Sequence, residues 1–525
     1  MASMLDGWPS LAGKPAISDV MRNGFIRPVT EEDIWEVIKN LKNNRSPGQD
    51  GITSSFLKHF WALIKTDVCR EIVEFFTLGV MDPSWKETIV VLIPKTPNAN
   101  APEHFRPISL CPIFYKIVAK LLVGRLQHIL PSLISEEQGA FVQGRQISHQ
   151  CFLAQEIIHK FRFSAAAAGF MALKIDMTQA YDKEILQSYC SWTGQSINAA
   201  KSFVLFNKVT PQWKKARLTH FLGFPRVEEF TYLGIKLALR RLNKSDYADL
   251  ICKTHTKIQA WGSRHLSLAG RAVLINHSVL ASTVFLMSHA QVPKGVLAAV
   301  ELAARSFLWQ RSANNRGMHY VDWASLCKPK NCGGLGFHAT TTWSGPLRAR
   351  FAWEYMQPPQ SLFLHAMHGR YSADIFNCPS RRSDSPVIRI IRKGADSLRP
   401  ISRWRISTGQ AVNIMDGRWL MDRVLACWPT IVDSPALDSM FLTELLTPTG
   451  TWDRLKLLRY FGPDMVDNIM QVSLYATRGR DELELNFRFS GKSIASLAYS
   501  ACFPDEEVDL KWLQRLGLRP RERMF

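Results

Sequence analysis

The chain has 525 residues, of which 46% are hydrophobic and 21% are charged; this composition is that of a globular protein and excludes general disorder. A chain of this length is too long to fold around a single hydrophobic core, so we expect several subdomains. Its 65 Lys and Arg residues against 45 Asp and Glu residues give a net charge of +20, which favours a polyanionic partner. A basic surface that binds nothing is the alternative.

The ten cysteines are scattered and form no Cys-x-x-Cys pair, so a zinc finger is not expected among them. They are typical of reduced cysteines in an intracellular protein, with nucleus and cytoplasm both open. Residues 1–13 lack the features of a signal peptide, and no run of about 18 apolar residues predicts a membrane span. We therefore expect no membrane partner.

The first 29 residues are expected to be irregular. Thr30 and Asp33 have nearly the spacing of a capping box, and the apolar periodicity after them predicts a helix that stops at the loop Ser46–Gly51, SPGQDG. Two further helices and a strand are predicted next, at 56–64, 68–78 and 88–93.

Apolar spacing then predicts one long helix over 114–130, with Lys116, Lys120 and Arg125 on its outer face and an end or kink at Pro131. Another helix is predicted near 147–163, followed by an alanine-rich loop at 165–168.

A short apolar strand, Phe170–Ile175, comes next and delivers Asp176 at its end. Tyr181 follows five residues later. Enzymes that add nucleotides need an aspartate at a strand end to hold Mg²⁺, and an aromatic side chain under the sugar of the incoming nucleotide.

Three motifs in series carry a resemblance to a known family: FRPISL (Phe105–Leu110), QGAFVQGR (Gln138–Arg145) and KIDMTQAYD (Lys174–Asp182). Together they closely resemble the reverse transcriptase of non-LTR (LINE-type) retrotransposons, particularly those of plants. The resemblance implies an α+β right-hand polymerase of fingers, palm and thumb, with a largely helical thumb and C-terminal region. It also implies RNA-directed DNA polymerase activity, Mg²⁺ as cofactor, and RNA and DNA as partners.

The same resemblance assigns roles to single residues. Asp176 is the implied catalytic and metal-binding residue. Arg106, and more weakly Lys95, would contact the phosphates of the incoming nucleotide, and Tyr181 would lie under its sugar; a core tyrosine is the alternative for Tyr181. Nucleic-acid contacts are implied for five cations of the fingers: Arg45, Lys116, Lys120, Arg125 and Arg145. The loop that follows Arg45 has an ordinary Pro-Gly turn as its alternative interpretation.

One block of the family is missing. In the family, palm helices and a hairpin bearing Ala-Asp-Asp follow the aspartate strand, whereas here Lys183 runs directly into Glu184 and into segments that belong after that hairpin. A single carboxylate is a poor Mg²⁺ site. We therefore expect an incomplete palm sheet, impaired Mg²⁺ binding and no DNA synthesis. Backbone groups from Leu173 to Met177 should then pair with 203–206 or 230–235, or remain poorly satisfied.

Downstream, the family's late palm strands are expected at 221–225 and 232–235. Tyr247-Ala248-Asp249 superficially resembles the missing acidic signature, but its surroundings predict a helix. The predicted divisions are an irregular N-terminus (1–29), fingers (30–169), a palm remnant (170–240) with its seam near 183/184, a thumb (241–345) and a C-terminal region (346–525) that stops before the family's zinc module.

A basic stretch from Arg381 to Arg405 contains Trp404 and could follow a nucleic-acid backbone, or form an ordinary salt-bridged surface. The leading hypothesis is an internally deleted and truncated reverse transcriptase, inactive as it stands. One alternative is a nucleic-acid-binding protein without polymerase activity; another is a complete enzyme whose missing block reflects wrongly joined exons. No small-molecule cofactor is expected, and the oligomeric state is open.

Overall fold

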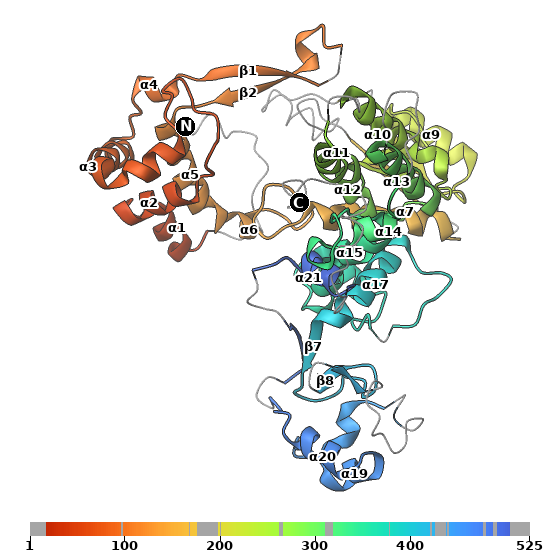
Figure 1. The fold of residues 1–525 in the computed structure, drawn as a ribbon. Coiled ribbons are helices and arrows are strands. Elements are labelled where there is room, and N and C mark those ends of the chain that lie inside the picture. Colours follow the sequence, from red (N-terminus) through yellow and green to blue (C-terminus); the bar gives the residue numbers. More distant parts are fainter. Residues whose placement is uncertain are drawn as a thin grey trace. The chain divides into compact units, whose positions relative to one another are not determined.

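The computed structural model describes most of the chain (Figure 1). The described residues are 17–95, 98–166, 169–175, 198–199, 201–261, 266–309, 319–376, 378–420, 423–425, 437, 440–475, 479–486 and 491–503. The chain forms two compact units, Met1–Gln146 and Ile147–Phe525. Both mix helices with short antiparallel strand pairs, as expected for an α+β protein, and every sheet in the described ranges has two strands.

The first unit is mostly helical. Its elements are α1 (Asp19–Ile26), α2 (Glu31–Asn40), α3 (Ser54–Leu78), α4 (Pro83–Lys86), β1 (Ile89–Pro94), β2 (Phe105–Leu110), α5 (Ile113–Gln127) and α6 (Leu130–Leu133). The capping box of α2 is confirmed, because Thr30 accepts from the Asp33 amide and Asp33 accepts from the Thr30 amide. Two expectations were wrong: α1 lies within the stretch expected to be irregular, and α3 is one helix where two were predicted.

The core of this unit lies where α2, α3 and α5 meet. Ile38, Ile72 and Ile117 from these three helices are completely buried there. By contrast, β1 and β2 form an antiparallel hairpin that pairs Ile93 with Arg106, and all six residues of β1 are exposed. This hairpin therefore extends from the core and is not part of it.

The second unit begins with α7 (Ile147–Phe163), within the range predicted from the sequence. The strands that follow are β3 (Met171–Lys174), β4 (Phe203–Phe206), β5 (Glu229–Tyr232) and β6 (Ile235–Ala238), with α9 (Gln212–Leu222) between β4 and β5. The β3 strand pairs with β4, placing Leu173 opposite Val204, so the pairing with 203–206 is confirmed. The strand expected at 221–225 was wrong, because Phe221 and Leu222 end α9 and Gly223 closes it in a left-handed conformation.

One face of these strand pairs is covered by α7. Ile158 and Phe161 from α7 pack with Leu205 of β4 and with Ile235 and Leu237 of β6. Ala172 of β3 packs against this cluster, whereas its neighbours Met171 and Leu173 are exposed. The α7 helix thus packs against both strand pairs, β3–β4 and β5–β6.

A helical region follows. Its elements are η3 (Lys244–Tyr247), α10 (Ala248–Trp261), α11 (Leu268–Leu274), η4 (Ile275–Leu280), α12 (Ala281–His289), α13 (Lys294–Trp309), α14 (Trp323–Cys327), η5 (Lys330–Cys332), α15 (Thr340–Met356), α16 (Leu362–His368), α17 (Pro386–Leu398) and α21 (Ile494–Ser500). The helix predicted around Asp249 is confirmed as α10. The α15 and α17 helices pack closely together, since a Cβ on Gly394 would overlap the Arg348 carbonyl.

Within the described residues, the stretch Leu268–His289 is long and apolar enough to cross a membrane, a test that core helices of globular proteins also pass. Three of its residues, Ile275, Val279 and Leu280, are completely buried against α10 and α13 in the core of this region. The absence of a membrane partner remains a prediction.

The remaining described residues form a separate hydrophobic cluster, centred on Ile414, Leu442 and Val466. Its elements are β7 (Ser402–Arg405), β8 (Arg418–Leu420), β9 (Arg423–Val424), η8 (Leu442–Leu445), α19 (Arg454–Tyr460), α20 (Pro463–Met470) and β10 (Glu482–Leu485). The β7 strand pairs with β10, and Asp481, just before β10, accepts hydrogen bonds from four backbone amides of the loop after β7: Ser407, Thr408, Gly409 and Ala411.

Candidate nucleic-acid interface

The loop Ser46–Gly51 is built onto the first turn of α5. A Cβ on Gly48 would lie 2.5 Å from the Cys111 carbonyl carbon, so only glycine allows this close approach. Asp50 Oδ2 accepts from the Ile113 amide at 2.7 Å and supplies the cap that Pro112, at the N-cap position, lacks. Sequence reasoning missed the role of Asp50; its signal was a helix start with no capping side chain of its own.

Of the five predicted cations, Arg45 lies just before this loop, and Lys116, Lys120 and Arg125 lie on α5. Lys116 Nζ donates to the Ser46 carbonyl at 3.0 Å and so joins the helix to the loop, while Lys120 is exposed. Arg45, just before the loop, is also exposed. Arg45 and Lys120 therefore present positive charge to solvent, whereas Lys116 already has an oxygen partner.

Arg125 and Arg145 are directed at the chain's own carbonyls. Arg125 donates to the Phe25 carbonyl at 3.0 Å, and partial burial lowers the pKa of its guanidinium. Arg145 donates to the carbonyls of Ile134 at 2.7 Å and Gln138 at 2.8 Å, and it also donates to those of Pro131 and Ser135. Both arginines organise local backbone, and Arg145 in particular closes the loop that carries the QGAFVQGR motif.

The two residues predicted to contact nucleotide phosphates lie on the β1–β2 hairpin. Arg106 is exposed in β2, opposite Ile93 of β1. Lys95 follows β1 directly, and its amide donates to the His104 carbonyl at 2.7 Å, which extends the ladder by one hydrogen bond. The structure thus brings Arg106 and Lys95 to the same end of one hairpin.

Asp176 and Tyr181 lie outside the described residues. The strand that leads to Asp176 is described: Lys174, in β3, pairs with Phe203 across the sheet and places its Nζ 5.3 Å from the centre of the Phe203 ring. Among the residues that the structure describes, no group of three or more His, Cys, Asp or Glu side chains could hold a metal ion.

The carboxylates in and beside Tyr247-Ala248-Asp249, the segment that superficially resembles the acidic signature, form salt bridges. Asp246 accepts from Lys236 at 2.8 Å, from Arg240 and from the Asn243 amide, and these contacts, that to Arg240 first, hold the pKa of its carboxyl far below the usual range. Asp249 is exposed and pairs with Lys253 one turn along α10. These carboxylates are therefore already matched with cations.

The basic stretch Arg381–Arg405 divides into two sets. Arg392 pairs with Asp384 at 2.7 Å, and Arg403 and Arg405 both pair with Glu484 across the β7–β10 ladder. Arg382 and Arg389, by contrast, are exposed. The salt-bridged interpretation holds for the first set only.

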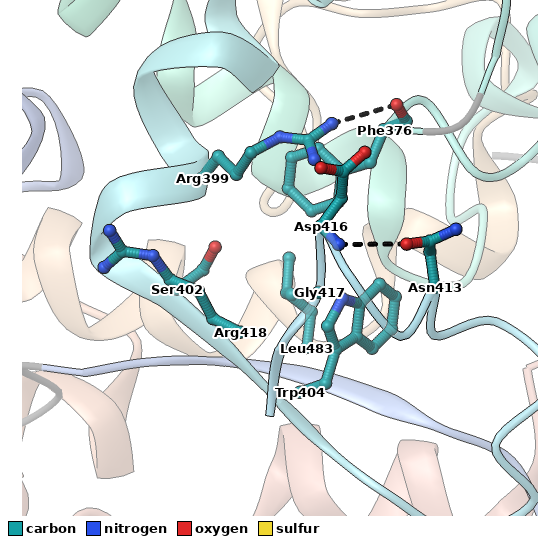
Figure 2. A pocket seen from close by; sticks show the side chains of 9 residues that line it. All are labelled: Phe376, Arg399, Ser402, Trp404, Asn413, Asp416, Gly417, Arg418 and Leu483. Atoms are coloured by element: carbon teal, nitrogen blue, oxygen red, sulfur yellow. Dashed lines mark hydrogen bonds between the residues drawn. The ribbon is translucent and has the colours of Figure 1, made fainter. Parts of the chain in front are cut away.

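Trp404 is not placed to stack on a base. It packs against two of the hydrophobic clusters of the second unit, and its ring lies edge-on to Phe376 with centroids 6.4 Å apart. Figure 2 shows the small pocket beside it, with Arg399 donating to the Phe376 carbonyl and the Asp416 amide donating to Asn413. The pocket encloses about 10 Å³, which is room for one water molecule and not for a base.

Several of the relatives found by comparison with known proteins are named as transposon or retrotransposon proteins. The chain is 30% identical over 196 residues to a 149 kDa protein of transposon TX1 from Xenopus laevis, covering 37% of this chain and 15% of the relative. It is 25% identical over 273 residues to an Arabidopsis thaliana protein named as a ribonuclease H protein, covering 51% of this chain and 44% of the relative. It is 31% identical over 169 residues to a protein of transposon BS from Drosophila melanogaster named as a probable RNA-directed DNA polymerase, covering 30% of this chain and 18% of the relative.

The chain thus matches less than half of the length of each of these relatives. No family model matches it.

Proposed function

We propose that this chain, which derives from a non-LTR retrotransposon and belongs with reverse transcriptase-like proteins, holds nucleic acid but does not copy it. Under this proposal the first unit is the fingers of a right-hand polymerase, the strands from β3 to β6 are what remains of the palm, and the helices from α10 onward form the thumb. RNA and DNA are the proposed partners.

One observation carries the proposal: β3, which ends at Lys174 just before Asp176 in the sequence, pairs directly with β4, a later segment of the chain. In the family this strand precedes the acidic hairpin, and here Lys183 joins Glu184 without it. Two-metal phosphoryl transfer needs carboxylates from both strands. Among the described residues, no group of three or more His, Cys, Asp or Glu side chains could hold a metal ion, which supports the proposal.

The cations of the first unit support the binding half of the proposal. Arg45, Lys120 and Arg106 are exposed, and attachment to phosphates requires only such side chains. Lys116, Arg125 and Arg145 would act indirectly, by holding in place the backbone to which they donate hydrogen bonds. Tyr181 and Lys95 keep their proposed places beside the nucleotide.

Primer extension tests the loss of synthesis. The full chain, given primer, RNA or DNA template, nucleotides and Mg²⁺ or Mn²⁺, should extend no primer, while a known reverse transcriptase in the same reaction does. Extension that disappears in Asp176→Ala would contradict the proposal, because a working site would then exist. Binding is tested separately: no retention of nucleic acid at low salt by folded protein would contradict that half.

A complete reverse transcriptase is the second candidate, favoured by the abrupt join of Lys183 to Glu184 in an otherwise continuous family order. Sequencing the transcript across this junction tests it. An in-frame block encoding Ala-Asp-Asp would establish the complete enzyme and overturn the inactive one.

A further inference from the structure

A groove of about 930 Å³ in the second unit has a basic lining: eight of the residues that line it are Lys or Arg, one is acidic, and the others are apolar or uncharged. Its walls come from the end of α7, the segment from β6 to Tyr247, the loop before α13 and the residues at the start of α17. Six cations at its surface have no ion pair within the described part of the chain: Arg162, Arg241, Lys244, Lys294, Arg382 and Arg389. Sequence reasoning singled out only the last two of them.

The acidic content of the groove is already neutralised. Asp384 alone among the described lining residues is acidic; it is 3% exposed and pairs with Arg392 at 2.7 Å. Lys236 and Arg240 also line the groove, but their charges are matched by Glu229 and Asp246. A cluster of unmatched cations in a hollow repels itself, and a polyanion relieves that repulsion.

An exposed aromatic ring stands at the same groove. Phe163, the last residue of α7, is 65% exposed, although large aromatic side chains are normally buried. The guanidinium of Arg162 lies 5.2 Å from the centre of its ring, and the centre of the His159 ring lies 4.7 Å from it. An exposed aromatic ring beside a guanidinium offers a surface on which a base can stack.

We propose that this groove binds a segment of single-stranded nucleic acid, with the phosphates on Arg241, Lys244 and the cations around them and one base stacked on Phe163. Single strands are favoured because a duplex keeps its bases stacked on one another and offers none to an aromatic side chain. Two of its walls are anchored by packing, since α7 covers the strand pairs and α17 is packed closely on α15. The inference rests on the proposed function and adds to it a site outside the first unit.

The test is fluorescence anisotropy of a labelled oligouridine, its DNA counterpart and a duplex of equal length, titrated with the full chain at several salt concentrations. Arg241→Gln combined with Lys244→Gln should weaken single-strand binding on the order of tenfold at 0.1 M salt. It should make the negative slope of log K against log salt shallower by about 1.4, which is twice the ~0.7 expected per phosphate contact. Phe163→Leu should weaken binding by about fivefold or more and leave the slope unchanged.

The matched control is Lys208→Gln with Arg217→Gln, which removes the same charge from two exposed residues of the same unit that do not line the groove. It should change the affinity by less than about twofold if direct contacts with the nucleic acid contribute more to binding than the overall positive charge of the protein does. Equal losses in the groove pair and the control pair would overturn the inference. So would binding of heparin as tight as that of the oligonucleotide and unaffected by Phe163→Leu.

The two proposals fail in different ways. If the wild-type chain binds no nucleic acid, the proposed function fails. If it binds and the groove variants behave as the control pair does, only the groove assignment fails.

Discussion

His159 is a buried residue whose surroundings disfavour the protonated, positively charged form of its imidazole. Burial first, then the positive charges of Arg370 and Arg162, lowers the pKa of its imidazole to about 4. Its unfolded value is about 6.5, so the unfolded chain binds more protons between pH 4 and 6.5, and stability falls as the pH drops through this range. We expect this histidine to contribute about 3 kcal/mol at neutral pH that is lost by pH 4.

The measurement is urea denaturation of the full chain at several pH values between 4 and 7. In His159→Asn, whose amide can still accept from Arg370 in place of Nδ1, the loss of stability on acidification should be smaller by this amount. The same substitution at exposed His128 should leave the pH dependence unchanged. Parallel curves for wild type and His159→Asn would contradict the assignment.

Single site residues could be predicted from the sequence only as far as their charge. Arg145 and Arg125 were expected to contact nucleic acid, and that stays a prediction; in the structure both donate to backbone carbonyls of the chain itself. A guanidinium suits a phosphate and a carbonyl equally, and only the fold decides which is within reach. For the same reason no pattern distinguished paired Arg403 from exposed Arg389.

At the scale of elements, the strand pair β7–β10 depends on one carboxylate. Asp481 Oδ1 accepts from the amides of Ser407, Thr408 and Gly409 at 2.8–2.9 Å, and Oδ2 accepts from that of Ala411 at 3.0 Å. Asp481→Ala leaves these donors without their partner and should destabilise this part of the chain by about 2 kcal/mol.

Denaturation followed by tryptophan fluorescence measures the effect, since Trp419 and Trp452 lie in the adjoining core. The matched control is Asp416→Ala, at an exposed aspartate of the same region. Equal midpoints for the two variants would show that the four amides find other partners.

Elements with strong local signals could be predicted, and those that depend on distant contacts could not. The capping box of α2 and the whole of α7 follow from spacing that is local. The α1 helix is held by Arg125, a hundred residues away in sequence, through the Phe25 carbonyl. The α3 helix was divided at a polar stretch, but Lys65, Thr66 and Asp67 are tolerated inside a helix, whereas a proline or glycine would have ended it.

At the scale of the whole molecule, two units with separate cores predict two unfolding transitions in place of one. Ile38→Ala, in the core of the first unit, should remove about 2–5 kcal/mol from that unit and lower one transition by roughly 5 °C or more. Ile390 is completely buried in α17 of the second unit, and Ile390→Ala should lower the other transition. Scanning calorimetry of both variants measures this, and a single transition lowered by either substitution would show that the units unfold together.

The β1–β2 hairpin has a consequence for handling the protein in solution. Five consecutive apolar residues, Ile89 to Ile93, are exposed on a two-stranded ribbon, and this run carries no charge. Such a segment is a template for pairing between chains, and the protein's net charge of +20 is what keeps copies apart at low ionic strength. Raising the salt concentration therefore weakens that repulsion along with any attachment to phosphates, so purified protein should precipitate or form oligomers under the very conditions that release it from nucleic acid.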